Sequence, residues 1–272
     1  QNNLPPGISG PIVSSRAGSR GRSASLSVLL PQFGQPARIT SIYIGSESTY
    51  TVDKYKAALT RAPVKEFVGV VDNMERLSHD VMGVVIKLPE GEHISFSAGQ
   101  YINIILEDGE RRAFSFASAP HNARNIELQI RLVPGGRFTT HVFEKMKVGD
   151  AIRFEGPLGD FVLRESNRPI IFVAGATGFA PVKNMVEDAF HRGLKRPIRL
   201  YWGVRQRRDF YLQHLPEQWQ REHDNFKFIP VLSEAGPGDE WSGRTGLVHE
   251  AILQDFPSLA GNEIYACGSV RM

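Results

Sequence analysis

The 272-residue sequence contains a single cysteine, Cys267, and this scarcity excludes several kinds of protein. One thiol cannot form an intrachain disulfide, and within one copy it cannot hold an iron–sulfur cluster bound by several thiolates. No apolar run reaches the roughly 20 residues that a helix needs to cross a bilayer. We therefore expect neither a disulfide scaffold nor a membrane partner, and the cytoplasm is the expected compartment.

Acidic residues are absent from positions 1–46, which carry four arginines and therefore a local charge of +4. Because the whole chain has a formal charge of +3, residues 47–272 are nearly neutral. A neutral remainder lacks the basic surface that nucleic acids require, so no nucleic-acid partner is expected. Residues 1–62 also show no periodicity, and positions 14–23 are rich in Ser, Gly and Arg. This composition predicts a disordered or non-homologous leader, and it also fits an organellar transit peptide.

From residue 63 the pattern changes to short apolar runs separated by turn residues. Strands are expected at 67–71, 82–88, 101–106, 113–117, 126–132 and 151–155, with a short helix at 138–146. The run at 126–132 alternates apolar and polar residues, as a strand with one buried face does. Six strands and one helix predict a closed antiparallel barrel over residues 63–166.

After residue 167, strand and helix patterns alternate along the chain. Strands are expected at 169–173, 198–204, 226–232 and 263–266, and helices at 180–192, 209–222 and 247–256. Such alternation predicts a parallel sheet that helices cover on both faces. A second domain of the α/β class is therefore expected over residues 167–272.

The segment Arg112-Ala113-Phe114-Ser115 places a cation, an aromatic ring and a hydroxyl in one extended run. Arginine can donate two hydrogen bonds to a phosphate, and residues two apart share one side of a strand, so Arg112 and Phe114 can act together. Further along, Gly136 precedes a helical pattern that contains Thr139. A glycine turn at a helix N-terminus offers N–H groups to a diphosphate. Each feature alone is also typical of a core aromatic, a rim charge or a plain helix cap.

A second glycine motif, Gly175-Ala176-Thr177-Gly178-Phe179-Ala180-Pro181, follows an expected strand and opens an expected helix. Glycines let the backbone approach a pyrophosphate, and Pro181 suits the first turn of a helix. The spacing differs from the Gly-x-Gly-x-x-Gly fingerprint of dinucleotide-binding domains. Cys267-Gly268 follows the fourth expected strand, at the end of the sheet where open α/β sheets bind ligands. A buried, unreactive thiol is the alternative for Cys267.

In this order and spacing the motifs resemble those of the ferredoxin–NADP reductase superfamily, over about residues 64–272. Within the superfamily the chain is similar to the bacterial NAD(P)H–flavin reductases and the CDP-6-deoxy-delta-3,4-glucoseen reductase type. The resemblance implies a Greek-key flavin-binding barrel followed by a parallel-sheet nicotinamide-binding domain. It also implies an oxidoreductase that transfers hydride from NADH or NADPH to bound FAD and passes electrons to an iron–sulfur or other acceptor.

The resemblance further implies roles for individual residues, and it implies no metal ligand. Ser115 would hydrogen-bond the flavin N5, Thr177 would lie between flavin and nicotinamide, and Cys267 would lie near the nicotinamide C4, which makes these three the catalytic positions. The implied flavin-binding residues are Arg112, Ala113, Phe114, Ser115, Gly136 and Thr139. The implied nicotinamide-cofactor-binding residues are Gly175, Thr177, Gly178, Ala180, Pro181, Arg205, Cys267 and Gly268.

Two points stay open. The arginines after the second strand of the parallel sheet, at 205, 207 and 208, either bind a 2′-phosphate, which would imply NADPH, or form a solvated basic turn.

Members of the superfamily usually continue past the position of Met272, and the glucoseen reductase type carries a [2Fe–2S] ferredoxin domain. We therefore expect a C-terminally incomplete second domain and an acceptor protein or [2Fe–2S] domain outside this chain. A free-flavin reductase and a non-catalytic flavin-binding fragment are the alternative functions.

Overall fold

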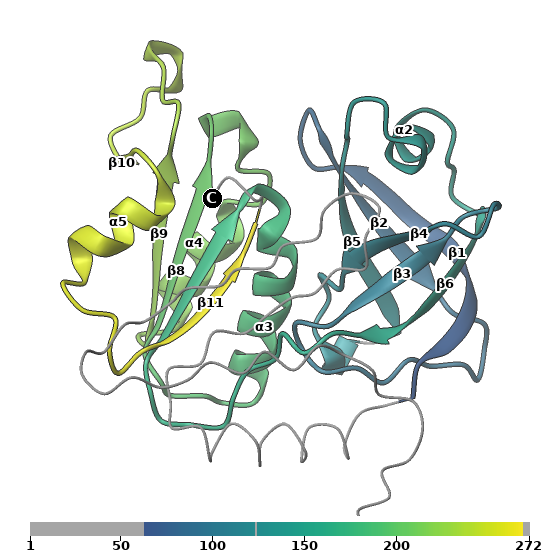
Figure 1. The fold of residues 1–272 in the computed structure, drawn as a ribbon, viewed down its shortest axis with the longest axis horizontal. Coiled ribbons are helices and arrows are strands. Elements are labelled where there is room, and N and C mark those ends of the chain that lie inside the picture. Colours follow the sequence, from purple (N-terminus) through teal and green to yellow (C-terminus); the bar gives the residue numbers. More distant parts are fainter. Residues whose placement is uncertain (1–62, 123, 269–272) are drawn as a thin grey trace, which may run out of the picture.

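The computed structural model describes residues 63–122 and 124–268, and these form two β-sheets with one helix standing between them (Figure 1). The first sheet is antiparallel and the second is parallel. The leader predicted over residues 1–62 lies outside the described residues. Among the residues that are described, no helix is both long and apolar enough to span a bilayer.

The first sheet has six strands in the order β4-β3-β6-β1-β2-β5. Its strands are β1 (Lys65–Arg76), β2 (Val81–Lys87), β3 (Tyr101–Ile105), β4 (Arg111–Ser115), β5 (Asn125–Arg131) and β6 (Ala151–Leu158). The short helix η1 (Pro120–Asn122) precedes β5, and α2 (Arg137–Glu144) precedes β6. The Ala117 N–H donates to the carbonyl of Glu127 at 2.8 Å, which joins the chain leaving β4 to β5 and closes the sheet into a barrel.

The interior of the barrel is filled by inward-facing apolar side chains. The alternation expected around residue 126 is present in β5, where Ile126, Leu128 and Ile130 are fully buried. The intervening polar residues are not in solvent, however, since Gln129 is only 5% exposed and Glu127 is half-buried. The expectation of a single buried face was therefore wrong for this strand, because its polar face packs against the second sheet's elements.

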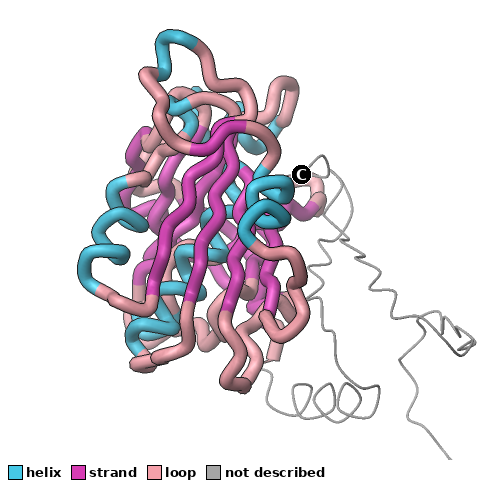
Figure 2. The backbone as a smooth tube through the Cα atoms, turned by 90° about the vertical axis from the view of Figure 1, so that its left-hand side faces the viewer, coloured by secondary structure: helices cyan, strands magenta, loops and turns pink. Residues whose placement is uncertain are grey.

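The second sheet has five parallel strands in the order β10-β9-β8-β7-β11, which Figure 2 shows side by side. Its strands are β7 (Ile170–Gly175), β8 (Ile198–Val204), β9 (Phe226–Leu232), β10 (Arg244–Thr245) and β11 (Glu263–Cys267). Its helices are η2 (Ala176–Gly178), α3 (Phe179–His191), η3 (Arg207–Asp209), α4 (His214–Glu222), η4 (Pro237–Asp239) and α5 (Val248–Asp255). Side chains of α3 and α4 pack on one face and those of α5 on the other, so both faces are covered as expected.

The helix expected at 209–222 is the main error in the prediction of secondary structure. The chain forms η3, then a turn over residues 211–213, and α4 begins only at His214. Phe210 and Tyr211 are both buried, and the Phe210 ring meets Trp202 edge-on at 5.1 Å between ring centres. Phe210 has φ −78° and ψ 85°, which is not helical. Aromatic packing thus overrides the local helical pattern, and Pro216 lies in the first turn of the shortened helix.

The linker between the two sheets is held by a buried ion pair. Arg196 donates to the carbonyls of Arg168 at 2.6 Å and Arg164 at 3.0 Å, and to Glu263 Oε2 at 2.6 Å. Burial acts against ionisation of Glu263, but hydrogen bonds from Ser166, Arg196 and Tyr265 hold the pKa of its carboxyl below the usual range. The predicted domain division between residues 166 and 167 falls in this linker and stays a prediction.

Candidate functional site

Strand β4 carries the residues predicted to bind flavin. Phe114 lies opposite Ile102 and Arg112 opposite Ile104 of β3, so both side chains share one face of the strand. The Phe114 ring lies 5.4 Å from the ring of Phe138, centre to centre, which places the first turn of α2 beside it. Ala113 and Ser115 are half-buried on the same strand, where they pair with Asn103 and Tyr101. The structure therefore brings the two predicted flavin motifs together.

Two arginines converge beside this turn. Arg112 donates to Glu110 Oε2 at 2.5 Å, and Arg137 donates to Asp108 Oδ2 at 2.6 Å while lying 3.9 Å from Glu110. The hydrogen bond from Arg137 lowers the pKa of the Asp108 carboxyl. Sequence reasoning missed Arg137, although its position directly after the predicted glycine turn was a usable signal. Arg112 and Arg137 thus place two positive charges near the start of α2, where Glu110 and Asp108 neutralise them.

The turn before α2 uses its hydroxyl internally. Thr139 is buried, and its Oγ1 accepts from the Val133 N–H at 3.1 Å and lies 3.3 Å from the carbonyl oxygens of Val133 and Gly136. No side chain caps the N-terminus of α2 at Gly136. The donors that this turn can offer are therefore backbone N–H groups, and binding of a ligand by the Thr139 hydroxyl stays a prediction.

These residues fit the chemistry of FAD. Two guanidinium groups beside an uncapped helix N-terminus suit a diphosphate, because both supply N–H donors and positive potential. The half-buried Phe114 offers a flat apolar surface for a ring system. Binding of a diphosphate would exchange the carboxylates of Asp108 and Glu110 for phosphate oxygens as partners of the arginines.

The second glycine motif forms a tight junction between β7 and α3. Ala176 has a positive φ of 47°, and its carbonyl accepts from Trp202 Nε1 at 3.0 Å. The Trp202 ring in turn stacks on Phe179, with 3.9 Å between ring centres. Gly178 is buried, and a Cβ at this position would lie 1.9 Å from the carbonyl oxygen of Cys267. Only glycine therefore lets α3 begin against the end of β11.

The sheet order explains why this junction meets Cys267. β7 lies between β8 and β11, so the chain leaves β7 toward one side and returns on the other. Such a switch point is where open α/β sheets bind ligands, outside the carboxyl ends of the strands. Ala174 and Cys267 are register partners there, and Ala180 and Pro181 lie buried in the first turn of α3. The turn that contains Thr177 thus lies next to Cys267 and Gly268.

The thiol of Cys267 has little nucleophilic reactivity. The residue is half-buried, and burial raises the pKa of the thiol to about 12, so it stays neutral at ordinary pH. A neutral thiol is a poor nucleophile. The hydroxyl of the buried Tyr211 donates to Gln129 Oε1 of β5 at 2.7 Å. This bond and the contact of β5 with η2 place the barrel directly beside the second glycine motif.

The arginines after β8 lie apart from these buried residues. Arg205 is exposed, and its Nε lies 3.6 Å from Glu234. The Arg207 N–H donates to the Asp239 carboxylate at 3.0 Å, and its guanidinium donates to the Asp239 backbone carbonyl at 3.2 Å. A 2′-phosphate at this turn would therefore meet carboxylates as well as guanidinium groups. Binding of a 2′-phosphate by these arginines stays a prediction.

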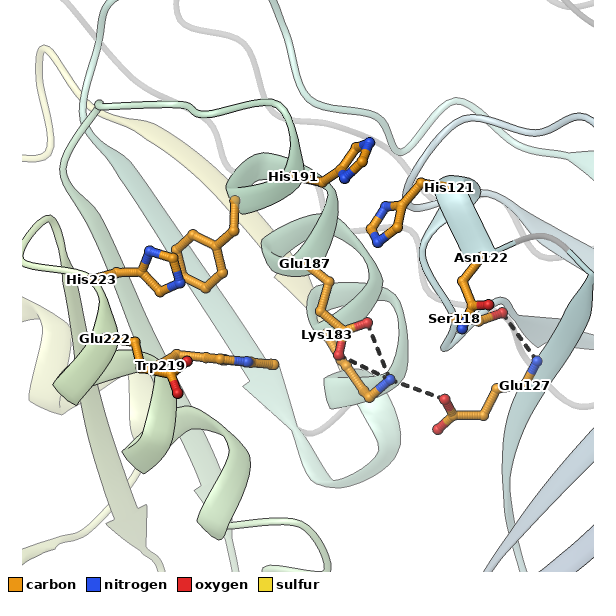
Figure 3. Close-up of a pocket in the computed structure, with 11 residues that line it drawn as sticks. Ser118, His121, Asn122, Glu127, Lys183, Glu187, His191, Trp219, Glu222 and His223 are labelled. Atoms are coloured by element: carbon orange, nitrogen blue, oxygen red, sulfur yellow. Dashed lines mark hydrogen bonds and ion pairs between the residues drawn. The ribbon is translucent and has the colours of Figure 1, made fainter.

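Lys183 and Asn184 of α3 face the barrel, and sequence reasoning missed both. Lys183 donates to Glu127 of β5 at 2.9 Å and to Glu187 at 3.2 Å, as Figure 3 shows. Burial opposes its charge, but the two carboxylates raise the pKa of Lys183 above its usual value. The signal in the sequence was Asn184 itself, a polar residue among the apolar positions of the helix predicted at 180–192. These contacts form a polar network that joins the two sheets.

A cavity of about 470 Å³ lies toward the C-terminal end of α3. It is lined by Lys183 and mainly polar residues from α3, α4 and the segment around η1, and the rings of His121 and His191 stack there at 3.9 Å (Figure 3). None of the residues predicted to bind a cofactor lines it. The cavity is therefore separate from the candidate cofactor site.

Two protein families match consecutive parts of the chain. The family described as oxidoreductase FAD-binding domain matches residues 69–163, and that described as oxidoreductase NAD-binding domain matches residues 172–272. These matches correspond to the barrel and to the parallel sheet. The expected fold, a flavin-binding antiparallel barrel followed by a parallel-sheet nicotinamide-binding domain, is confirmed, and FAD and NAD(P)H are the cofactors that the two domains support.

Named relatives cover most of this chain. The CDP-6-deoxy-L-threo-D-glycero-4-hexulose-3-dehydrase reductase of Yersinia pestis is 39% identical over 80% of this chain and 65% of its own length. Reductase component 1 of terephthalate 1,2-dioxygenase from Comamonas sp is 37% identical over 75% of this chain and 61% of its own length. The solved structure of the Amycolatopsis cytochrome P450 reductase GcoB superposes with a TM-score of 0.71 and 32% identity, over 76% of this chain and 63% of that chain. The chain spans less than two thirds of the length of these relatives.

Proposed function

Because this chain belongs to the ferredoxin–NADP reductase superfamily, we propose that it transfers hydride from NAD(P)H to bound FAD and passes the electrons to an iron–sulfur or other acceptor. The observation that carries the proposal is the contact between Gly178 and Cys267 at the switch point of the parallel sheet, directly beside strand β5 of the barrel. This contact puts a glycine turn suited to a pyrophosphate next to the barrel that bears the flavin motif.

The barrel residues bind and orient the first cofactor. Arg112 and Arg137 hold the diphosphate together with backbone N–H groups at the start of α2. Phe114 supports the ring system, and Ser115 offers its hydroxyl one residue further along β4. Bound FAD supplies the chemistry that accepts a hydride and releases electrons one or two at a time.

The parallel sheet positions the nicotinamide nucleotide. The turn from Gly175 to Gly178 and the N-terminus of α3 bind the pyrophosphate, and Thr177 lies in that turn beside Cys267. Hydride transfer needs neither a nucleophile nor a general acid, and the neutral thiol of Cys267 is consistent with a packing and positioning role. The protein thus acts by orientation and by exclusion of water.

We propose that the terminal acceptor is an iron–sulfur protein or domain outside the described residues. The argument in favour is that similar proteins bear names such as dioxygenase reductase component. A cytoplasmic location is part of the same proposal, since one cysteine leaves no intrachain disulfide to require an oxidising compartment.

The experiment reconstitutes the chain with FAD, removes free flavin by gel filtration, and follows flavin absorbance anaerobically while NADH and then NADPH is added. We expect retained flavin that bleaches with at least one nucleotide. Arg112→Ala should lose FAD, because truncating one partner of a charge-assisted contact costs about 2–5 kcal/mol of binding. The matched control is Arg111→Ala, since Arg111 points to the other face of β4 and pairs with Glu155 at 2.8 Å.

Two outcomes would contradict the proposed function, and a third would contradict the role of Arg112. Flavin that elutes free of the parent protein but is still reduced by NAD(P)H would indicate a free-flavin reductase. Bound flavin that neither nucleotide bleaches would indicate a non-catalytic flavoprotein. Equal FAD content in Arg112→Ala and Arg111→Ala would remove Arg112 from the flavin site.

A further inference from the structure

Asn184 connects helix α3 to the barrel through two directional hydrogen bonds. The residue is fully buried, its Nδ2 donates to the Ser118 carbonyl at 2.6 Å, and its Oδ1 accepts from the Gly99 N–H at 3.0 Å. Both partners are backbone groups of the first sheet's loops. One amide therefore holds two separate segments of the barrel to one point on α3.

Lys183, the preceding residue, makes a second connection to the same region. Its Nζ donates to the Ala117 carbonyl at 3.0 Å and to the Glu127 carboxylate at 2.9 Å. Glu127 is itself joined to the loop after β4, because its N–H donates to Ser118 Oγ at 3.1 Å (Figure 3). Lys183 and Asn184 thus both bond the backbone of residues 117–118.

The two ends of this connection lie close to the two halves of the candidate site. Asn184 is five residues after Phe179, the first residue of α3, which is about 7.5 Å along a helix. Ser118 is three residues after Ser115, which is at most about 10 Å of extended chain. The glycine turn and the flavin strand are therefore linked through Asn184 by two short segments, one of them a helix.

Apolar contacts already attach α3 to the barrel. Val81, Ala98 and Phe161 of the first sheet and its loops belong to one core cluster with Val182 and Met185 of α3. Apolar attraction is non-directional and tolerates small sliding movements, whereas a hydrogen bond weakens once its length and angle depart from a narrow range. The Asn184 amide is thus suited to fix the position of α3 relative to the barrel, while the apolar contacts hold the two together.

We propose that Asn184 is a positioning residue for hydride transfer, which fixes the turn from Gly175 to Gly178 relative to Phe114 and Ser115. The inference rests on the proposed function, since it assigns to Asn184 the alignment of the two cofactor sites. Asn184 acts through the two segments that it joins, and Lys183 supports it from the neighbouring position.

The test compares Asn184→Ala with Asn225→Ala. Asn225 is a control because its side-chain amide also bonds two backbone groups: it donates to the carbonyls of Leu194 at 3.1 Å and Arg196 at 2.8 Å, both within the second sheet's elements. For each variant the melting temperature, the FAD content, the dissociation constant for the nucleotide and the limiting anaerobic rate of flavin reduction are measured. Asn184→Ala should retain FAD and lose about 10²-fold in limiting rate, as a misplacement near 1 Å does. Asn225→Ala should lose stability but stay within about twofold of the parent rate, since the register between the sites is kept.

A second measurement needs no cofactor. Hydrogen exchange of the Gly99 amide should accelerate in Asn184→Ala and not in Asn225→Ala, because only the former removes its acceptor. If Asn184→Ala fails to fold, Lys183→Met, which keeps the length of the side chain, should show the same loss of rate with FAD retained. Equal limiting rates in the Asn184→Ala, Asn225→Ala and parent proteins would overturn the proposal. A parent protein that binds FAD but is reduced by neither nucleotide would refute the proposed function, and this inference with it.

Discussion

Replacement of Gly178 by alanine should impair the use of the nicotinamide nucleotide while leaving FAD bound. The added Cβ would lie 1.9 Å from the carbonyl oxygen and 2.4 Å from the carbonyl carbon of Cys267. Ordinary Cβ contacts begin near 3.4 Å, so the start of α3 and the end of β11 must separate by about 1.5 Å. Both neighbours are backbone, and a side-chain rotation cannot relieve the contact.

The size of the effect follows from this displacement. Overpacking of this kind costs about 1–3 kcal/mol, which lowers the melting temperature of a chain of this size by about 2–12 °C. A reactant displaced by about 1 Å loses about 10²-fold in rate, so flavin reduction by NAD(P)H should slow by at least that factor. FAD content should not change, because Gly178 lies at the end of the parallel sheet and not at β4 or α2.

The matched control is Gly238→Ala. Gly238 lies in η4, has nothing within 4 Å of an added Cβ, and is not among the glycines with positive φ. Stopped-flow reduction under anaerobic conditions, at saturating nucleotide, gives the limiting rate for both variants and the parent. A parent-like rate in Gly178→Ala despite a lowered melting temperature would refute the reasoning, because the contact would then serve only the fold.

Three further predictions concern the coenzyme, the linker and the thiol. If the basic turn binds a 2′-phosphate, simultaneous replacement of Arg205, Arg207 and Arg208 by alanine should raise the dissociation constant for NADPH far more than that for NADH; equal increases would assign NADH and a solvated turn. Glu263→Gln leaves the buried Arg196 without its carboxylate, which should cost about 3–5 kcal/mol near neutral pH. Because the pKa of the Glu263 carboxyl is lower in the folded state, this stabilisation is present above the unfolded pKa of about 4.3 and is lost as pH falls through the folded value. Melting curves of parent and variant should converge in acid, and a pH-independent difference would contradict the assignment. Cys267→Ser should slow flavin bleaching with little change in melting temperature, and the reverse result would make the thiol a packing group only.

Local patterns predicted the strands and the main turns because their causes are local. The alternation at Ile126, Leu128 and Ile130 reflects the two-residue repeat of a strand, and it holds in β5. The glycine motif after β7 predicts a strand–turn–helix junction because a turn of that kind needs particular residue types. The strand expected at 113–117 instead ends at Ser115, since the following residues leave β3 and join β5. That choice depends on a strand partner which no local pattern specifies.

The polar contacts between the sheets could not be predicted in this way. Asn184 bonds Ser118, 66 positions earlier, and Gly99, 85 positions earlier. Tyr211 and Gln129 are 82 positions apart. Tyr211 lies within the helix predicted at 209–222, and Gln129 lies on the polar face of the strand predicted at 126–132. A polar residue in an amphipathic pattern is assigned to solvent unless another surface covers it, and that covering surface is a property of the tertiary structure.

The order of residue types alone predicted the two consecutive domains, the succession of strands and helices in each, and the motifs that suit a flavin and a nicotinamide nucleotide. It did so because periodicity, turn chemistry and motif spacing act over a few residues. Folding creates three contacts that no local pattern predicts: Gly178 lies against the Cys267 carbonyl at the start of α3, Arg137 lies near Glu110, the partner of Arg112, and Asn184 links α3 to the barrel. These contacts depend on which surfaces meet when the chain folds, and residues far apart in the sequence carry no local signal of that meeting.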